Sequence, residues 1–261
     1  MNSEWIADFW RYRELLYFLA WRDVKVRYKQ AALGASWAVI QPLLTMIIFT
    51  LFFGGLARVP SDGIPYPLFS FCALVPWTYF STILGHAGNS LISNAQLITK
   101  VYFPRALLPA ATVLSGLVDF SVGAVVLVLM MMYYHVKPGW PLLLAPLFFA
   151  GMVVLAFSVS MFLAALNVRY RDVKYALPFL VQIWLFVTPI IYPVTFLPAK
   201  IRPLLAFNPM AGLLEGFRSS LLGRKQMDWR LEGISVAITL VLLVIGAAYF
   251  RKTEKTFADI V

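Results

Sequence analysis

The chain has 261 residues, of which 61% are hydrophobic, 16% are aromatic and only 13% are charged. Soluble domains carry roughly a quarter charged residues, so this composition excludes an ordinary soluble domain and indicates an integral membrane protein. A net charge of +10 is also found in proteins that bind nucleic acid or anionic lipid. In so apolar a chain we expect membrane lipid as a partner and no nucleic acid.

Residues 1–37 are predicted to form a cytoplasmic amphipathic helix. Its apolar stripe recurs at alternating steps of four and three residues, which places the members on one helical face. The stripe consists of Trp5, Phe9, Tyr12, Leu16 and Leu19. An aromatic stripe with a charged back is typical of a helix in the lipid headgroup plane. A helix packed on a partner domain is the alternative, and both arrangements can hold at once.

Six segments are long and apolar enough to cross a membrane, which takes about 20 residues of helix. They are residues 38–57, 67–87, 106–134, 142–166, 176–196 and 233–250. Residues 38–261 are therefore predicted to form a six-span transmembrane domain of an all-α polytopic membrane protein. The lone cysteine, Cys72, lies within the second span, cannot form an internal disulfide, and is expected to be a packing residue.

The connection between spans five and six is long and semi-apolar. Within residues 198–223, Asn208 can cap a helix, Pro209 suits the first helical position and Gly223 suits the end. A helix between them is too short to span a membrane, so we expect short re-entrant or interfacial helices here.

The distribution of Lys and Arg predicts the orientation. If the N-terminus is cytoplasmic, the short outer loops hold only Arg58 and Lys137, and the other short connections carry many more basic residues. Both termini are therefore expected in the cytoplasm. The last outer loop is also basic, but the rule applies poorly to a loop with structure of its own.

Two internal connections are then cytoplasmic. The first, "NSLISNAQLITKVYFPRALLP", is predicted to be a short amphipathic helix with Leu91, Ala95, Ile98 and Tyr102 on one side. A solvated loop is the alternative. The second, "LNVRYRDVKYALP", mixes Asp172 with basic residues. It is either plain topogenic charge or, with the other cytoplasmic elements, part of a docking surface.

We do not expect the chain to catalyse a reaction by itself. No G-x-x-x-x-G-K-[ST] motif occurs, so nucleotide chemistry must come from a partner. The two histidines, His86 and His135, lie near opposite ends of different spans without further ligands at metal-site spacing, so no metal site is expected. No catalytic residues are assigned.

The outer loop does hold carboxylates that a membrane transferase could use for acid and base work. They are Glu215, Asp228 and Glu232. A simpler interpretation pairs Glu215 with Arg218, three residues further along the predicted helix.

Asp119 is the only charged residue within the predicted spans, near mid-depth of the third. Such a carboxylate is costly and faces the protein interior. It is either a structural, hydrogen-bonded or protonated group, or a part of the translocation path or a gate. Pro189 and Pro193 remove backbone hydrogen bonds and are expected to kink the fifth span.

These motifs, in this order, carry a resemblance to a known family. The quoted segments are "WRDVKVRYKQAALGASWAVIQPLL", "LNVRYRDVKYALP", "TPIIYP" and "FNPMAGLLEGFRSSLLG". The chain resembles the membrane permease of bacterial ABC exporters for surface polysaccharides, over essentially its whole length. The N-V-x-x-R-D-V stretch, residues 167–173, and the N-P-M turn, residues 208–210, are the most specific parts.

The resemblance implies export of a lipid-linked glycan across the inner membrane by two permease copies and two ATPase subunits. Cofactors are expected on the partner, as ATP and magnesium, and none in this chain. The resemblance places ATPase docking on the N-terminal helix and on the helix between spans two and three, and pore lining on spans one and five. The expected docking or coupling residues are Arg22, Lys25, Asn94, Gln96, Lys100, Arg169, Arg171 and Asp172. The expected pore-lining aromatics are Phe49, Phe52, Trp184 and Tyr192, with Asp119 and Pro189 as gate candidates.

O-antigen is the preferred substrate, with capsule, teichoic acid, or a drug or small lipid as alternatives. A membrane glycosyl- or acyltransferase is a competing class, and a secondary transporter that uses Asp119 for protons is a third.

Overall fold

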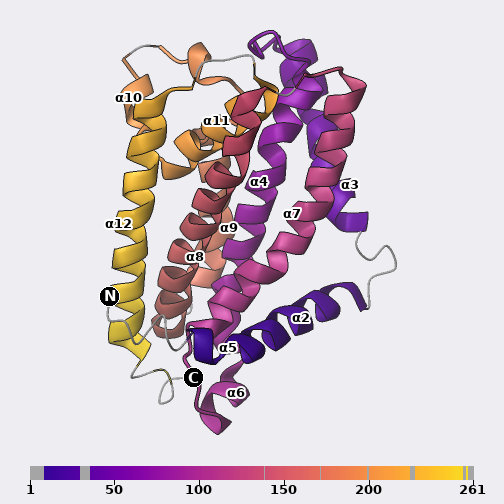
Figure 1. Cartoon of the computed structure of the whole chain (residues 1–261). Helices are drawn as coiled ribbons and strands as arrows, with labels where there is room; N and C mark the ends of the chain where they lie inside the picture. The colour runs from indigo at the N-terminus through magenta and orange to yellow at the C-terminus, as the bar shows by residue number, and fades with distance from the viewer. Residues whose placement is uncertain are drawn as a thin grey trace.

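The computed structural model describes residues 9–29, 36–137, 139–170, 172–198, 200–223, 227–254 and 257. Its regular elements in these ranges are all helices, which confirms the predicted all-α class. The long helices stand side by side as one bundle (Figure 1).

Five helical segments in the described ranges are long and apolar enough to cross a membrane. They are Trp37–Leu56 (α3, Trp37–Phe49, continued by η2, Thr50–Leu56), Tyr66–Ala87 (α4), Leu107–Tyr133 (α7), Trp140–Arg169 (η3, Trp140–Leu144, and α8, Ala145–Arg169) and Trp229–Glu254 (α12). These five match predicted spans one, two, three, four and six. Asp119 lies on α7.

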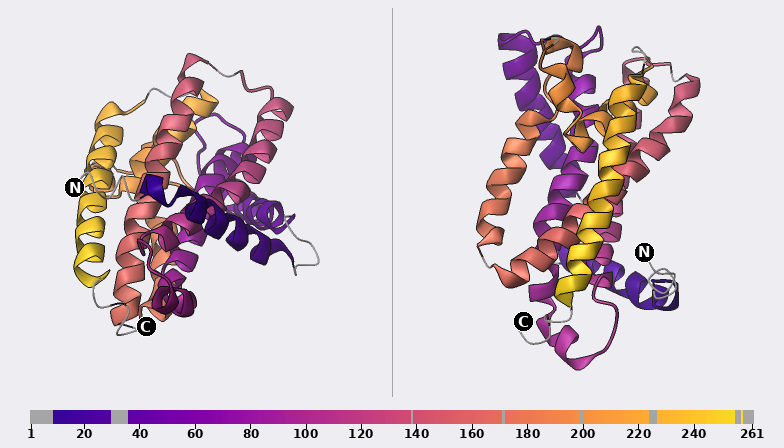
Figure 2. Two further views of the ribbon diagram at one scale, coloured as in Figure 1. Left: turned by 60° about the horizontal axis from the view of Figure 1, so that its bottom comes forward. Right: turned by 90° about the vertical axis from the view of Figure 1, so that its left-hand side faces the viewer.

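The predicted fifth span corresponds to α9, Val173–Val187, with only 15 residues. The prediction of a kinked helix over 176–196 is wrong in its second half, because the helix ends before Pro189 and does not bend through it. The amide of Thr188 makes the last helical bond, to Trp184, and the chain then turns. A proline has no N–H to continue the ladder, which accounts for this end. Helix α9 lies at the edge of the bundle, where it contacts α4 and α8 (Figure 2).

Short helices gather at the two ends of the bundle. Helix α2 (Arg13–Lys29) lies across one end with α5 (Ser90–Ser93) and α6 (Ala95–Lys100), and we call this the α2 end (Figures 1 and 2). Helices α10 (Arg202–Leu205) and α11 (Pro209–Leu222) lie at the opposite end, which we call the α11 end. The short helix η4 (Val194–Phe196) joins α9 to this region.

Helix α11 forms as its sequence predicts. The Asn208 side chain accepts a hydrogen bond from the amide of Met210, Pro209 is the first helical residue, and Gly223 ends the helix at φ 62°. Every residue of α11 is buried, and the helix packs against α4, α8 and α12. It therefore has no exposed face of the kind that a helix on a membrane surface presents.

A second apolar cluster lies at the α2 end, apart from the main core around α4. It joins Leu19 of α2, Leu91 of α5, Ile98 of α6, Val168 of α8 and Phe250 of α12. The short helices of this end thus share one packed core with the ends of the long helices.

Candidate functional site

The predicted apolar stripe of α2 contacts the protein itself. Leu19 is buried, and Phe9, Tyr12 and Leu16 pack partly buried against the same cluster. The four residues therefore share a face, as predicted, but that face covers the bundle and does not point to lipid; Trp5 lies outside the described residues. Aromatic residues that the spacing analysis missed are exposed on α2 and on the preceding turn: Trp10, Tyr17, Phe18 and Trp21. These, and not the predicted stripe, are available to a lipid surface.

The connection between α4 and α7 contains two short helices where one was predicted. The break falls at Asn94, whose side-chain amide donates to the carbonyl of Ser90. Leu91 and Ile98 are buried on one side, as predicted. Tyr102, predicted on that side, is 92% exposed, because α6 ends at Lys100 and the chain continues extended. Gln96 and Lys100 are exposed and Asn94 is half-buried, so this element offers polar groups at the tip of the α2 end.

Asn167 was not predicted as a functional residue. It is 1% exposed, and its side-chain amide donates to the carbonyl of Gly88 at 2.8 Å and to Oδ1 of Asn89 at 3.1 Å. This joins the end of α8 to the start of the α4–α7 connection. An amide side chain at the end of a long apolar helix, just before the charged stretch, is the signal that could have identified it.

The charged stretch after α8 is exposed in its described part. Arg169 lies over the ring of Tyr170 and Lys174 over that of Tyr175, at 5.4 Å and 4.8 Å. In the described part of the chain, no ion pair joins Asp172 to Arg169 or Lys174. The predicted residue Arg171 lies outside the described residues.

Two predicted docking residues on α2 have contacts within that helix. Arg22 forms an ion pair with the adjacent Asp23 at 2.9 Å, and Lys25 lies over the ring of Trp21 at 5.6 Å. These contacts leave both residues at the surface, where a partner can reach them.

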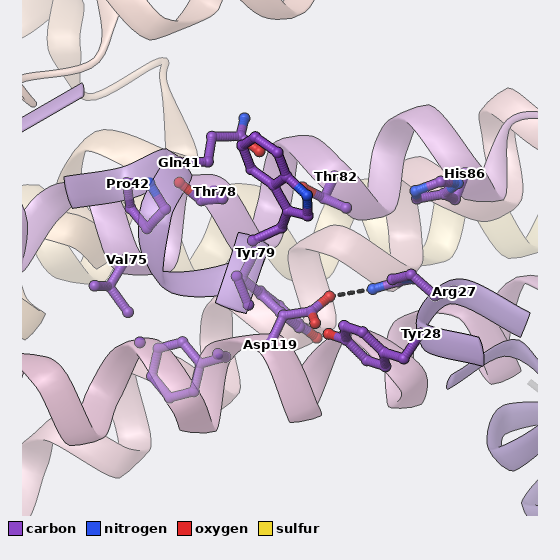
Figure 3. Close-up of a pocket in the computed structure, with 15 residues that line it drawn as sticks. Arg27, Tyr28, Gln41, Pro42, Val75, Thr78, Tyr79, Thr82, His86 and Asp119 are labelled. Carbon is purple, nitrogen blue, oxygen red and sulfur yellow. Dashed lines mark hydrogen bonds and ion pairs between the residues drawn. The ribbon is translucent and has the colours of Figure 1, made fainter. Parts of the chain in front are cut away.

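Asp119 has a basic partner that the sequence did not reveal. Nη1 of Arg27, on α2, forms an ion pair with Oδ2 of Asp119 across a separation of 92 residues (Figure 3). The other carboxylate oxygen, Oδ1, is buried without a hydrogen-bond partner in the described structure. The helix at the surface of the bundle is thus bonded to the charged residue of a membrane-length helix.

This ion pair lines a cavity of about 260 Å³ between α2, α3, α4 and α7. Tyr28, Gln41, Thr82 and His86 also line the cavity (Figure 3). A second cavity, of about 440 Å³, is lined by residues of α2, α4, α5 and α7. The two cavities share Arg27 and His86. We call the first, between α2, α3, α4 and α7, the inner cavity. We call the second, between α2, α4, α5 and α7, the outer cavity.

The predicted pore aromatics fall into two groups. Phe52 is exposed, and Phe49 is half-buried with its ring edge-on to Phe53. Trp184 packs edge-on to Phe80 and donates its indole N–H to Asn208, so its ring and its N–H are both engaged. The hydroxyl of Tyr192 donates to the carbonyl of Phe186, back toward the end of α9. In the described residues, no ring contact joins Phe49 or Phe52 to Trp184 or Tyr192.

Beyond the end of α9, Arg218 of α11 holds the turn. Its Nη2 donates to the carbonyls of Pro189 and Ile190, and its Nη1 pairs with Glu215 at 3.2 Å. The predicted Glu215–Arg218 ion pair is confirmed. The guanidinium also lies 3.9 Å from the centre of the Phe69 ring. Two carboxylates of the predicted outer loop remain. Asp228 accepts hydrogen bonds from the amides of Arg230 and Leu231 in the first turn of α12, and Glu232 is 2% exposed.

Comparison with known proteins shows which family and which proteins the sequence is similar to. A family model described as "ABC-2 type transporter" matches residues 14–222. The chain is 30% identical over 257 residues to "O-antigen export system permease protein RfbA" of Myxococcus xanthus, covering 97% of this chain and 98% of that protein.

A protein of the same name from Klebsiella pneumoniae is 30% identical over 251 residues, with 95% of each chain covered. "Polysialic acid transport protein KpsM" of Escherichia coli is 22% identical over 246 residues, covering 90% of this chain and 91% of that protein. Because the family model covers most of the chain and the first relative matches it almost end to end, the chain belongs to the ABC-2 type transporter family.

Proposed function

We propose that the chain is the membrane-spanning subunit of an ATP-driven exporter that moves a lipid-linked polysaccharide across the inner membrane. The observation that carries the proposal is the end-to-end similarity to permeases named for O-antigen export. O-antigen is the preferred substrate, and capsule or teichoic acid is the alternative within the same mechanism. On this proposal the chain is not itself an enzyme, and ATP and magnesium bind to the partner subunit.

The geometry of the α2 end supports a docking surface for that ATPase. The exposed or half-buried polar residues Arg22, Lys25, Asn94, Gln96, Lys100, Arg169 and Asp172 all lie at this end. Helices α2, α6 and α8, which carry most of these residues, share a single apolar cluster, so displacement of any of them reaches the long helices directly. On this proposal the α2 end and both termini face the cytoplasm.

The proposed assembly contains two copies of this chain and two ATPase subunits. In support of a second copy, α3 and α9 both pack against α4 and expose apolar side chains on their other faces. These include Ile47 on α3, Leu51 and Phe52 on its continuation η2, and Phe179, Ile183 and Phe186 on α9. The proposed path runs between the copies, with α9 as a short fifth span that α11 completes from the outer side.

The test asks whether a neighbouring gene encodes a phosphate-loop ATPase and reconstitutes that protein with this chain. We expect the two proteins to purify together, and proteoliposomes that hold both to export lipid-linked glycan only when ATP is supplied. An ATPase whose phosphate-loop lysine is changed to alanine is the matched control and should assemble without export. Failure of any phosphate-loop ATPase to associate would contradict the proposal. Supplying O-antigen, capsule and teichoic acid precursors in parallel identifies the substrate.

The same preparation distinguishes the competing classes. A proton-coupled secondary transporter would work with a pH gradient and no ATPase. A transferase would lose product when Asp228 and Glu232 are changed to amides. Asp228 caps α12 and Glu215 pairs with Arg218, so the structure gives Asp228 and Glu215 structural roles.

A further inference from the structure

The boundary between the inner and outer cavities is formed by a cation with unused donors. Arg27 lines both cavities, and in the described structure its hydrogen bond goes to Asp119 alone. A guanidinium carries several N–H groups in a planar fork that matches carboxylate and phosphate oxygens in pairs. Because Arg27 donates to only one oxygen of Asp119, its other N–H groups remain available to a further acceptor.

The outer cavity is lined by more basic than acidic side chains, because Asp119, which pairs with Arg27, lines the inner cavity instead. The charged lining residues of the outer cavity are Arg22, Arg27 and Asp23, and Asp23 is held by Arg22. Ser93, Asn94 and Thr112 add hydroxyl and amide groups, and His86 lines the boundary. Arginine beside hydroxyl and amide donors is the chemistry by which proteins recognise phosphoryl groups.

Asp119 is held on Arg27 through a single carboxylate oxygen. Oδ2 accepts a hydrogen bond from Arg27, whereas Oδ1 is buried with no hydrogen-bond partner in the part of the chain that the structure describes. A phosphoryl group offers several oxygens and can fill more of the guanidinium fork than this single oxygen does. Such an anion can therefore compete with Asp119 for Arg27.

We propose that the outer cavity is a binding site for a phosphoryl group, and that the bound anion replaces Asp119 on Arg27. Resting on the proposed function, the inference assigns this site to the phosphate-bearing end of the exported substrate. The two arginines of the site, Arg22 and Arg27, both line the outer cavity.

Replacement has a consequence for the path between the cavities. Arg27 and Asp119 both line the inner cavity, and their bond ties α2 to α7. When an anion binds Arg27 in place of Asp119, the bond between α2 and α7 is broken at the boundary between the two cavities. Substrate binding and loosening of α2 are thereby a single event.

The test measures binding to the full chain in phosphatidylcholine nanodiscs, with inorganic pyrophosphate in one arm and a short polyprenyl pyrophosphate in the other. Asp119→Asn removes the resident competitor, and since a hydrogen bond to a charged group is at stake we expect tighter binding by about tenfold. The double variant Arg27→Ala/Asp119→Asn leaves no charge unpaired and should lose binding. Arg202→Ala, at the α11 end, is the matched arginine control and should bind as the parent does.

The two arms identify the source of the phosphoryl group. Binding of the polyprenyl compound in preference to pyrophosphate identifies a lipid headgroup, and the reverse identifies a free phosphate; either supports the site. Equal binding by the parent, Asp119→Asn and the double variant would overturn it. If the complex exports glycan with ATP and yet no variant changes anion binding, this inference fails while the proposed function stands.

Discussion

Arg218 of α11 donates through Nη2 to the carbonyl oxygen of Pro189, just beyond the end of α9, at 2.8 Å. The residue before α11 acts on the same segment, because Asn208 donates to the hydroxyl of Thr188 at 3.0 Å and accepts from the indole of Trp184 at 2.9 Å. Tyr66 adds a bond to the carbonyl of Ile191. The end of α9 is thus held by side chains where prolines interrupt the backbone ladder.

We predict that Arg218→Met destabilises the protein strongly. Arg218 is 3% exposed, and removing one partner of a buried charge pair costs roughly 3–5 kcal/mol. The apparent melting temperature in detergent should fall. Arg202→Met is the control, since Arg202 also donates to backbone carbonyls but is exposed, and it should change little. Equal effects of the two substitutions would contradict the buried role of Arg218.

A glycine pair tests the contact between α8 and α12. A Cβ at Gly246 would lie 2.6 Å from the carbonyl oxygen of Ser158, which is backbone and cannot move aside. Gly246→Ala should therefore force the helices apart and lower the melting temperature. Gly233→Ala, on the same helix with nothing within 4 Å, should be neutral or stabilise by about 0.5–1 kcal/mol through helix propensity. A harmless Gly246→Ala would show that the two helices are not packed so closely.

Asn167→Ala should reduce coupling as well as stability. The substitution removes both bonds that join α8 to the α4–α7 connection and leaves a buried carbonyl at Gly88 unpaired, a loss of about 1–3 kcal/mol. The measurement is the ratio of glycan exported to ATP hydrolysed. Thr99→Ala, on the exposed side of α6, is the control, because the Thr99 hydroxyl bonds only to carbonyls of its own helix, and it should leave that ratio unchanged. A lower melting temperature with an unchanged ratio would assign Asn167 a purely structural role.

Two exposed lysines test the proposed orientation. Lys100 lies at the α2 end, and Lys137 follows α7 toward the opposite end. In spheroplasts, an impermeant maleimide should label Lys137→Cys at once and Lys100→Cys only after permeabilisation. The native Cys72 is 0% exposed, so background labelling should be low. Labelling of Lys100→Cys in intact spheroplasts would reverse the proposed topology.

Local signals allowed much of the fold to be predicted. Asn208, Pro209 and Gly223 define α11 through capping chemistry, which depends only on near neighbours in the chain. Hydropathy gave five long helices for the same reason. The extent of α9 was predicted wrongly because two prolines are compatible with either a kink or an end. The choice depends on whether side chains such as Arg218 are available to bind the freed carbonyls.

Long-range pairings could not be predicted from one sequence. Arg27 and Asp119 are 92 residues apart, and many other arginines in the chain are equally plausible partners for a single carboxylate. The spacing of apolar residues identified the stripe on α2, but the spacing does not show whether that face of the helix contacts lipid or protein. Lipid and protein are both apolar, so the pattern fits either.

The cluster that joins Leu19, Leu91, Ile98 and Phe250 limits what a docked partner can do. Close-packed side chains transmit displacement with little compression. A partner that pushes on α2 therefore displaces the same packed cluster as a partner that pushes on α6. Two contacts with an ATPase would then report a single displacement to the long helices, and could not act as independent signals.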